Sequence, residues 1–323
     1  MVTIKDVAKK AYVGVGTVSR YLNDPKTVSK ETIKCIEKAI NELGFVPNEL
    51  ARSFKLRKTK TLAVLIPSIL LPFYSSIAYY IEMDAEKQGY KVLLCNTNGN
   101  KEKEIYYLSL FKEQRVDGII ALTYSLIDEY VDINFPIITF DRHFNNRVST
   151  ISSDNYMGGK LAAKHLIDIG CKTIAYIGTY QNIIDFEVVK RRQGFMDEAA
   201  QSNTEYIDFI EQDPIVDFVL LANSFLDKYP NVKGVFCEND DIAMYLIKEA
   251  LKREIKIPEQ LNVIGFDGIN DNFFNLMELT TIVQSPKLIA SKMVNKIIDL
   301  IISSSEVEEI IVPIYLRKGE TTK

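Results

Sequence analysis

The segment Gly14–Asn23, "GVGTVSRYLN", decides how the N-terminal part of the chain folds. Its two glycines, one residue apart, suggest a phosphate-binding loop, which must follow a strand and open a longer helix. Here the preceding residues, Ile4–Ala11, carry apolar side chains at helical spacing. Ser19 stands where a third glycine is required, and no Lys follows. The glycines therefore fit the exposed start of a second helix better, where small residues allow close approach to a DNA backbone.

Capping residues on both sides of this segment predict three short helices. Thr3 can cap the first helix, over Ile4–Ala11, and the second covers about Val15–Leu22. Ser29 can cap a third that runs to about Leu43, followed by glycine at position 44, where a helix commonly ends. Because a tight turn joins the first two helices, the pattern predicts a helix-turn-helix.

Charge is distributed unevenly along the 323 residues. Residues 1–60 hold 13 Lys and Arg against 6 Asp and Glu, a formal charge of +7, whereas the rest of the chain is at −11. A basic module on an acidic body is typical of a protein that binds nucleic acid at one end. A basic pair of surface helices with no such role is the alternative interpretation.

The chain changes character at Thr61. Residues 47–60 read as a short helix from Asn48 followed by a basic linker. Beyond them, apolar strand-like runs alternate with amphipathic helices, which predicts mostly parallel α/β sheets, with two sheets plausible for about 260 residues. A last strand, "IIVPIYL", is expected at residues 310–316. Polar, Gly or Pro residues follow many of the strands, at the edge where open α/β sheets bind ligands.

Several classes of protein find no support in the sequence. The four cysteines show no C-x-x-C spacing and there are two histidines, so neither a metal site nor a cofactor is expected. We expect no signal peptide and no membrane span, and therefore a cytoplasmic protein. An enzyme is not expected either, because no nucleophile elbow or Walker loop is present.

The chain resembles the lactose repressor/galactose repressor (LacI/GalR) family of bacterial transcription regulators. "TIKDVAKKA" with "TVSRYLN" is similar to the family's helix-turn-helix signature and "NELARSFK" to its hinge helix, while "RRQGF", "VFCENDDIAM" and "LNVIGFDGI" are similar to motifs of its body. The resemblance implies a helix-turn-helix domain over residues 1–46 and a hinge helix and linker over 47–60. It also implies an effector-binding and dimerisation domain over 61–323. That domain would hold two doubly wound α/β subdomains of periplasmic-binding-protein type, with crossovers near 154–160 and 284–290.

The resemblance also assigns DNA contacts in the head and hinge. They are Val15, Gly16, Thr17, Ser19, Arg20, Asn23, Asn48, Ala51, Phe54 and Lys55. Arg20 suits guanine as a bidentate donor, whereas Gly16 can read nothing, so specificity is expected to rest on Arg20 and the hinge. Phe54 stands where the family usually presents a Leu wedge, and an apolar wedge bends DNA by unstacking a base step. Packing between two hinge helices is the alternative role for Phe54. Tyr12 occupies the turn, where a positive φ would strain it.

A second set of residues is assigned to effector binding. It comprises Phe73, Tyr74, Asp154, Arg191, Asn239 and Asp267, of which Arg191 stands three residues before Gly194 in "RRQGF". An arginine fork suits sugar hydroxyls or a carboxylate. Asp141, Arg142 and His143 follow a strand and are further candidates for the cleft. A loop cap or a hydrogen bond between subdomains is the alternative role for each.

Together these features predict a repressor of carbohydrate-utilisation genes. A homodimer would bind a pseudo-palindromic operator in double-stranded DNA, under the control of a small effector, expected to be a sugar. Inducer and corepressor control remain open. The alternatives are a pleiotropic regulator controlled by a protein corepressor or a phosphorylated metabolite, and a cytoplasmic sugar-binding protein with no DNA role.

Overall fold

The computed structural model describes two compact units of the chain, Met1–Thr59 and Lys60–Lys323. The described residues are 2–46, 58–113, 115–132, 135–144, 148–179, 186–211, 217–269, 277–303 and 306–323. The hinge helix expected within residues 47–60, with Asn48, Ala51, Phe54 and Lys55, lies outside them.

The first unit is a helical head. Its elements are α1 (Ile4–Lys10), α2 (Val15–Asn23), a short 3₁₀ helix (Pro25–Thr27) and α3 (Lys30–Leu43). The backbone N–H and hydroxyl of Thr3 both donate to Asp6 at the start of α1, at 2.8 and 2.7 Å. Gly44 ends α3 with φ 61°. Tyr12, in the turn between α1 and α2, has φ 56°, so the expected backbone strain is present. Its side chain is 95% exposed.

Small and branched apolar side chains from all three α-helices form the core of the head. Val7, Val18 and Ile36 are fully buried, one on each helix. This core fixes α2 against α1 and α3, so that the remaining surface of α2 faces solvent.

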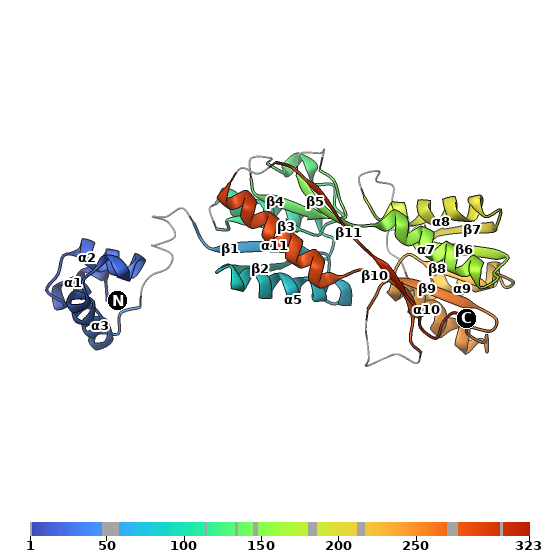
Figure 1. Cartoon of the computed structure of the whole chain (residues 1–323), viewed down its shortest axis with the longest axis horizontal. Coiled ribbons are helices and arrows are strands. Elements are labelled where there is room, and N and C mark those ends of the chain that lie inside the picture. The colour runs from blue at the N-terminus through green and yellow to red at the C-terminus, as the bar shows by residue number, and fades with distance from the viewer. Residues whose placement is uncertain are drawn as a thin grey trace. The chain divides into compact units, whose positions relative to one another are not determined.

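The second unit holds two six-stranded sheets within its described residues, here called the first and second lobes (Figure 1). The first-lobe strands are β1 (Thr61–Ile66), β2 (Lys91–Asn96), β3 (Gly118–Ala121), β4 (Ile137–Phe140), β5 (Ser149–Ser153) and β11 (Glu309–Val312). They follow the order β11-β5-β4-β3-β1-β2, and every pairing is parallel.

Helices cover both faces of the first-lobe sheet. These are α5 (Pro72–Lys87) and α11 (Pro286–Ile302) on one face and α6 (Lys101–Lys112) on the other, and a short 3₁₀ helix spans Asp128–Tyr130. Leu62 and Val64 of β1 pack with the first pair of helices, while Ala63 of the same strand packs with α6. Burial on both faces explains why the strands are continuous apolar runs.

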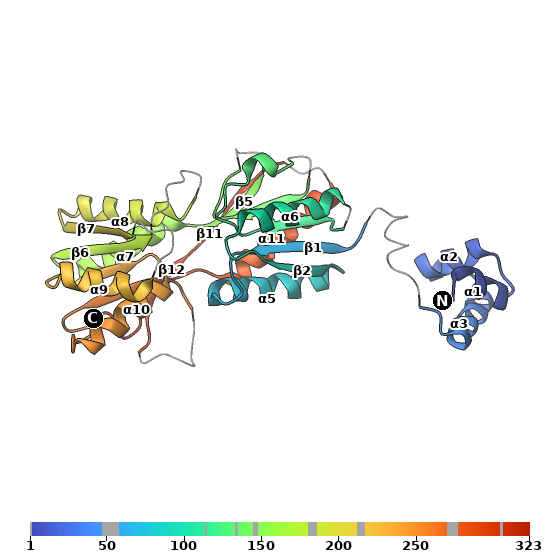
Figure 2. The ribbon, with the colours of Figure 1, turned by 180° about the vertical axis from the view of Figure 1, so that it is seen from behind.

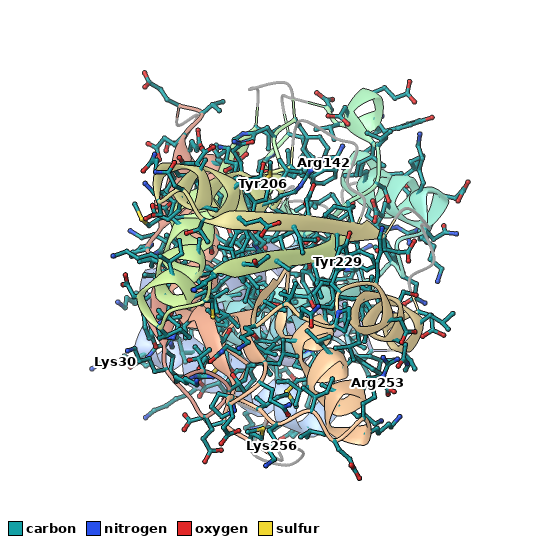
Figure 3. The ribbon with its side chains drawn as sticks, turned by 90° about the vertical axis from the view of Figure 1, so that its right-hand side faces the viewer. Lys30, Arg142, Tyr206, Tyr229, Arg253 and Lys256 are labelled. Atoms are coloured by element: carbon teal, nitrogen blue, oxygen red, sulfur yellow. The ribbon has the colours of Figure 1, made fainter. Side chains whose placement is uncertain are left out.

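The second lobe repeats the arrangement. Its strands are β6 (Thr173–Thr179), β7 (Glu205–Glu211), β8 (Gly234–Cys237), β9 (Asn262–Asp267), β10 (Thr280–Val283) and β12 (Tyr315–Arg317), in the order β12-β10-β9-β8-β6-β7. All pairings are parallel except that of β12 with β10. The helices are α7 (Asn155–Asp168), α8 (Val189–Gln201), α9 (Phe218–Lys228) and α10 (Asp240–Lys252). Tyr206 lies on the edge strand β7 (Figure 3).

Three connections pass between the lobes, and they run side by side in Figures 1 and 2. They lead from β5 to α7, from β10 to α11, and from β11 to β12. The last of these corrects the expectation of one strand over 310–316. That stretch forms two strands in different sheets, separated by Pro313, which has no N–H to give to a sheet. Of the described helices, none is long and apolar enough to cross a membrane.

Candidate functional site

A cavity of about 260 Å³ lies between the two lobes of the second unit. It sits at the carboxyl ends of β1, β4, β8 and β9, which is where open α/β sheets bind ligands. The first lobe contributes Pro67, Leu71, Phe73, Tyr74, Tyr124, Phe140 and Asp141 to its wall. The second contributes Val188, Arg191, Phe218, Glu238, Asn239, Asp241 and Asp267.

Arg191, on α8, is the most tightly held of these residues. Its Nε donates to Oδ1 of Asn155 at 2.7 Å and its Nη1 donates to the carbonyl oxygen of Glu238 at 2.8 Å. The guanidinium also lies 3.6 Å from the centroid of the Phe266 ring. These contacts leave the residue 5% exposed and fix the plane of its fork at the cavity wall.

Two strand-end carboxylates flank this guanidinium. Oδ2 of Asp141 is 3.8 Å from Nη2 of Arg191, and Oδ1 of Asp267 is 3.9 Å from Nη1. Asp267 accepts a hydrogen bond from Gln284 at 2.7 Å. Both aspartates have positive φ, 51° and 119°, a conformation that costs energy in a non-glycine residue.

Burial changes the acidity of these carboxyl groups. It raises the pKa of Asp141 to about 6, although Arg191 and hydrogen bonds from Asn155 and Ser153 act in the opposite direction. Burial likewise raises the pKa of Asp267 well above its usual range, against the attraction of Arg191. Oδ2 of Asp141 is buried with no hydrogen-bond partner among the described residues. The site therefore contains an acceptor that the protein itself leaves unused.

Glycines at the crossing of α7 and α8 determine where Arg191 stands. A Cβ added to Gly159 would lie 1.9 Å from the carbonyl oxygen of Arg191, and one added to Gly194 would lie 2.0 Å from that of Tyr156. Only glycine permits this backbone approach. Gly194, three residues after Arg191, thus helps to seat the arginine at the cavity.

Aromatic side chains form the opposite wall. Phe73 and Tyr74 stand near the start of α5 with ring centroids 5.6 Å apart. The hydroxyls of Tyr74 and Tyr124 are hydrogen-bonded, which joins α5 to the segment after β3. An aromatic face and a set of polar acceptors across one cavity suit a ligand with both apolar and hydroxyl surfaces.

The structure places all but one of the predicted effector residues at the cavity, the exception being Asp154. Phe73, Tyr74, Arg191, Asn239 and Asp267 line the cavity, as does Asp141. Oδ1 of Asn239 also accepts from Ile242 N and caps α10.

Asp154 is not among the lining residues, and its carboxylate caps α7 by accepting from Met157 N at 3.1 Å. The cavity wall also contains Tyr124, Glu238 and Asp241, which were not predicted from the sequence. The last two belong to the quoted motif "VFCENDDIAM", which was the available signal.

Arg142 and His143 lie elsewhere. Arg142 is fully buried, 2.6 Å from Asp128, and stacks between Phe144 and Phe186. His143 is 2.8 Å from Glu187, and with Glu309 the pair forms a candidate metal-ligand group among the described residues. Lys190 is 2.6 Å from the same oxygen of Glu187 and already supplies a cation there, so the group carries no argument for a metal.

The predicted DNA contacts that fall within the described residues all lie on α2 of the head. Val15, Gly16, Arg20 and Asn23 are exposed, and Thr17 and Ser19 are half-buried. Nη2 of Arg20 is 3.5 Å from the hydroxyl of Thr17, so the guanidinium remains available at the surface. A helix with small residues at its start and an exposed arginine can enter a major groove.

Comparison with known proteins decides the family. A family model for bacterial regulatory proteins of the lacI family matches residues 3–48. A second model, for periplasmic binding proteins and the sugar binding domain of the LacI family, matches residues 59–320. The chain belongs to the LacI family. It is a DNA-binding transcriptional regulator with a body built to hold a small molecule, and not an enzyme.

Relatives of known role share about a third of the sequence. The ribose operon repressor of Halalkalibacterium halodurans is 35% identical over 88% of this chain and 86% of its own. The sucrose operon repressor of Streptococcus mutans is 34% identical over 98% of both chains.

Solved structures agree on the fold. A LacI-type regulator from Alkaliphilus metalliredigens, complexed with D-xylulofuranose, is 34% identical with a TM-score of 0.74, covering 82% of this chain and 99% of that one. The Lac repressor dimer bound to operator and the anti-inducer ONPF has a TM-score of 0.87 at 22% identity, covering 99% of both chains.

Proposed function

We propose that this LacI-family protein represses carbohydrate-utilisation genes in the cytoplasm and that a sugar bound in the cavity controls its affinity for DNA. The protein binds a pseudo-palindromic operator as a homodimer. The observation that carries the proposal is the fixed guanidinium of Arg191 between the carboxyl groups of Asp141 and Asp267, at the strand ends of two lobes.

The chemistry of this wall supports a polyhydroxylated ligand. Arg191 donates in a planar fork, and Asp141 offers a buried oxygen that lacks a partner. Each sugar hydroxyl both donates and accepts, so it can satisfy groups of both kinds. A similar structure holds D-xylulofuranose, and two relatives are ribose and sucrose operon repressors, which supports the same class of ligand.

The head supplies the DNA contacts. Its formal charge of +7 over residues 1–60 suits a phosphate backbone, and the exposed Arg20 suits guanine in the major groove. The hinge residues Phe54 and Lys55 add contacts in the minor groove between two heads.

An apolar edge of the first lobe supports the homodimer. Leu93 and Leu94 of β2, the edge strand, are 41% and 39% exposed, and Tyr79 on the adjoining α5 is 59% exposed. Exposed apolar side chains on an edge strand and on the helix beside it suit an interface between subunits. Two-fold pairing there sets two heads on two half-sites, and the operator repeats that symmetry.

Control follows from the three connections between the lobes. A sugar that touches both lobes favours one angle between them, and each lobe movement is passed to the hinge. Regulation requires only that the sugar and the operator favour lobe angles differently. An inducer weakens DNA binding and a corepressor strengthens it. Operator affinity measured with and without the sugar distinguishes the two.

Fluorescence anisotropy with labelled duplexes tests the DNA part. We expect random-sequence duplex to bind at low salt with a steep salt dependence, and binding to be lost when residues 1–60 are removed. A thermal-shift screen with sugars tests the effector part, because a ligand of the folded form raises its melting temperature. A full-length protein that ignores every duplex at low ionic strength contradicts the proposal.

A further inference from the structure

The charges around the cavity are strongly unbalanced. Four carboxyl side chains line it, those of Asp141, Glu238, Asp241 and Asp267, against one cationic side chain, Arg191, among the described lining residues. Arg191 is already engaged by Asn155 and by the backbone of Glu238, and it faces two of the four carboxyl groups. Among the described lining residues, the wall therefore carries more carboxyl groups than cationic groups.

Resting on the proposed function, we infer that the cavity selects an unphosphorylated, uncharged sugar and rejects sugar phosphates and sugar acids. This names the chemical class of the effector and excludes control of this site by a phosphorylated metabolite.

Hydroxyl groups meet the needs of the wall without adding charge. The unpartnered Oδ2 of Asp141 accepts one sugar hydroxyl, and the guanidinium of Arg191 donates to a neighbouring oxygen on the sugar. The rings of Phe73 and Phe140, with centroids 5.9 Å apart, form an apolar surface for the C–H face of a pyranose or furanose. A neutral ring thus finds partners on both sides.

A phosphate group has the opposite effect. At a separation of about 7 Å and an effective dielectric constant of about 20, repulsion by one ionised carboxylate lowers affinity roughly 50-fold. Its several oxygens also need donors, and Arg191, which already donates to Asn155 and to the carbonyl oxygen of Glu238, is the one cationic donor among the described lining residues. We expect phosphorylation to weaken binding at least on the order of 100-fold.

Isothermal titration calorimetry on the full-length protein tests the inference. The probes are D-ribose, D-xylulose, D-fructose and D-glucose, each beside its 5- or 6-phosphate, with sucrose as a disaccharide. We expect at least one free sugar to bind and its phosphate to bind at least on the order of 100-fold more weakly.

Charge variants locate the cause of the selectivity. Asp241→Asn removes a negative charge from the wall with little change of shape, so we expect it to narrow the gap between sugar and sugar phosphate about 10-fold or more. Asp168→Asn, on the exposed end of α7, is the matched control and should leave the gap unchanged. The wild-type ratio stands as a test whether or not the Asp241 variant folds.

The outcomes separate this inference from the proposed function. A sugar phosphate that binds as tightly as its parent sugar overturns the inference and leaves sugar control in place. If no sugar or sugar phosphate binds at millimolar concentration, sugar control itself fails and the inference fails with it.

Discussion

Replacing Asp141 by Asn should stabilise the protein and abolish effector binding at the same time. The wild-type carboxyl group is 1% exposed, and its burial raises the pKa from an ordinary 3.8 to about 6. The amide of Asn keeps an acceptor for Ser153 and Asn155 and tolerates the positive φ at this position. The variant thus removes a buried charge with little change in the backbone.

The pKa shift sets the size and the pH dependence of the effect. The folded chain holds the Asp141 proton more tightly than the unfolded chain does, so wild-type stability falls as the pH rises from about 4 to about 6. Above pH 6 the loss reaches about 3 kcal/mol, taken as an upper bound from ~1.4 kcal/mol per pKa unit. Asn does not titrate and escapes this loss, which corresponds to roughly 5–10 °C in melting temperature for a body of this size.

Thermal melts without effector, at pH 4.5 and pH 7.5, measure this difference. The Asp141→Asn variant should melt higher than wild type at pH 7.5, and the gap should shrink at pH 4.5. Calorimetry at pH 7.5 should show that the sugar no longer binds, because the amide oxygen stays with Ser153 and Asn155 and the NH2 group, a donor, replaces the free acceptor Oδ2. Asp168→Asn should match wild type in both assays. An unchanged or lower melting temperature at pH 7.5, or an equal gap at both pH values, would refute the reasoning.

Three further predictions address the head, the hinge and the seat of Arg191. Arg20→Ala should weaken operator binding by about 1–3 kcal/mol and relax the preference for guanine, measured by anisotropy with operator variants; an unchanged sequence preference would remove Arg20 as a base reader. Phe54→Ala should reduce operator affinity and bending, measured by circular-permutation gel mobility, with sugar binding intact; unchanged bending would remove the wedge role. Gly194→Ala should lower the free energy of unfolding by about 1–3 kcal/mol or more and weaken sugar binding, because its Cβ would lie 2.0 Å from a carbonyl oxygen of α7. The neighbouring surface change Gln193→Ala should do neither, and equal behaviour of these two α8 variants would show that the helix crossing does not seat the arginine.

Local signals explain which parts of the fold could be predicted from the sequence. β1 is an unbroken apolar run, and Gly44 stops α3 in the left-handed conformation that glycine favours. β7 was not predicted from the sequence, because this edge strand, "EYIDFIE", contains acidic residues and has no unbroken apolar run. The stretch around Pro313 was predicted as one strand, because nothing in the sequence indicates that its two halves, β11 and β12, join different sheets.

The site was harder to predict from the sequence, because its contacts depend on the tertiary structure. Arg191 and Asp267 were named through the resemblance, and the structure brings both to the cavity wall. Asp154 was assigned to the effector by the same route, yet its carboxylate caps α7. The backbone carbonyl oxygen of Glu238 accepts a hydrogen bond from Arg191. Because any residue type could make this backbone contact, the sequence does not reveal it. The excess of carboxyl groups becomes visible only when four strand and helix ends meet in space.

Coupling between the head and the cavity is the central claim, and one titration tests it directly. Operator duplex is selected from random DNA with the full-length protein, and its dissociation constant is measured by anisotropy without sugar and with saturating sugar. We predict a change in operator affinity on the order of 10-fold or more, in either direction. A sugar that saturates the cavity and leaves operator affinity unchanged would contradict the account.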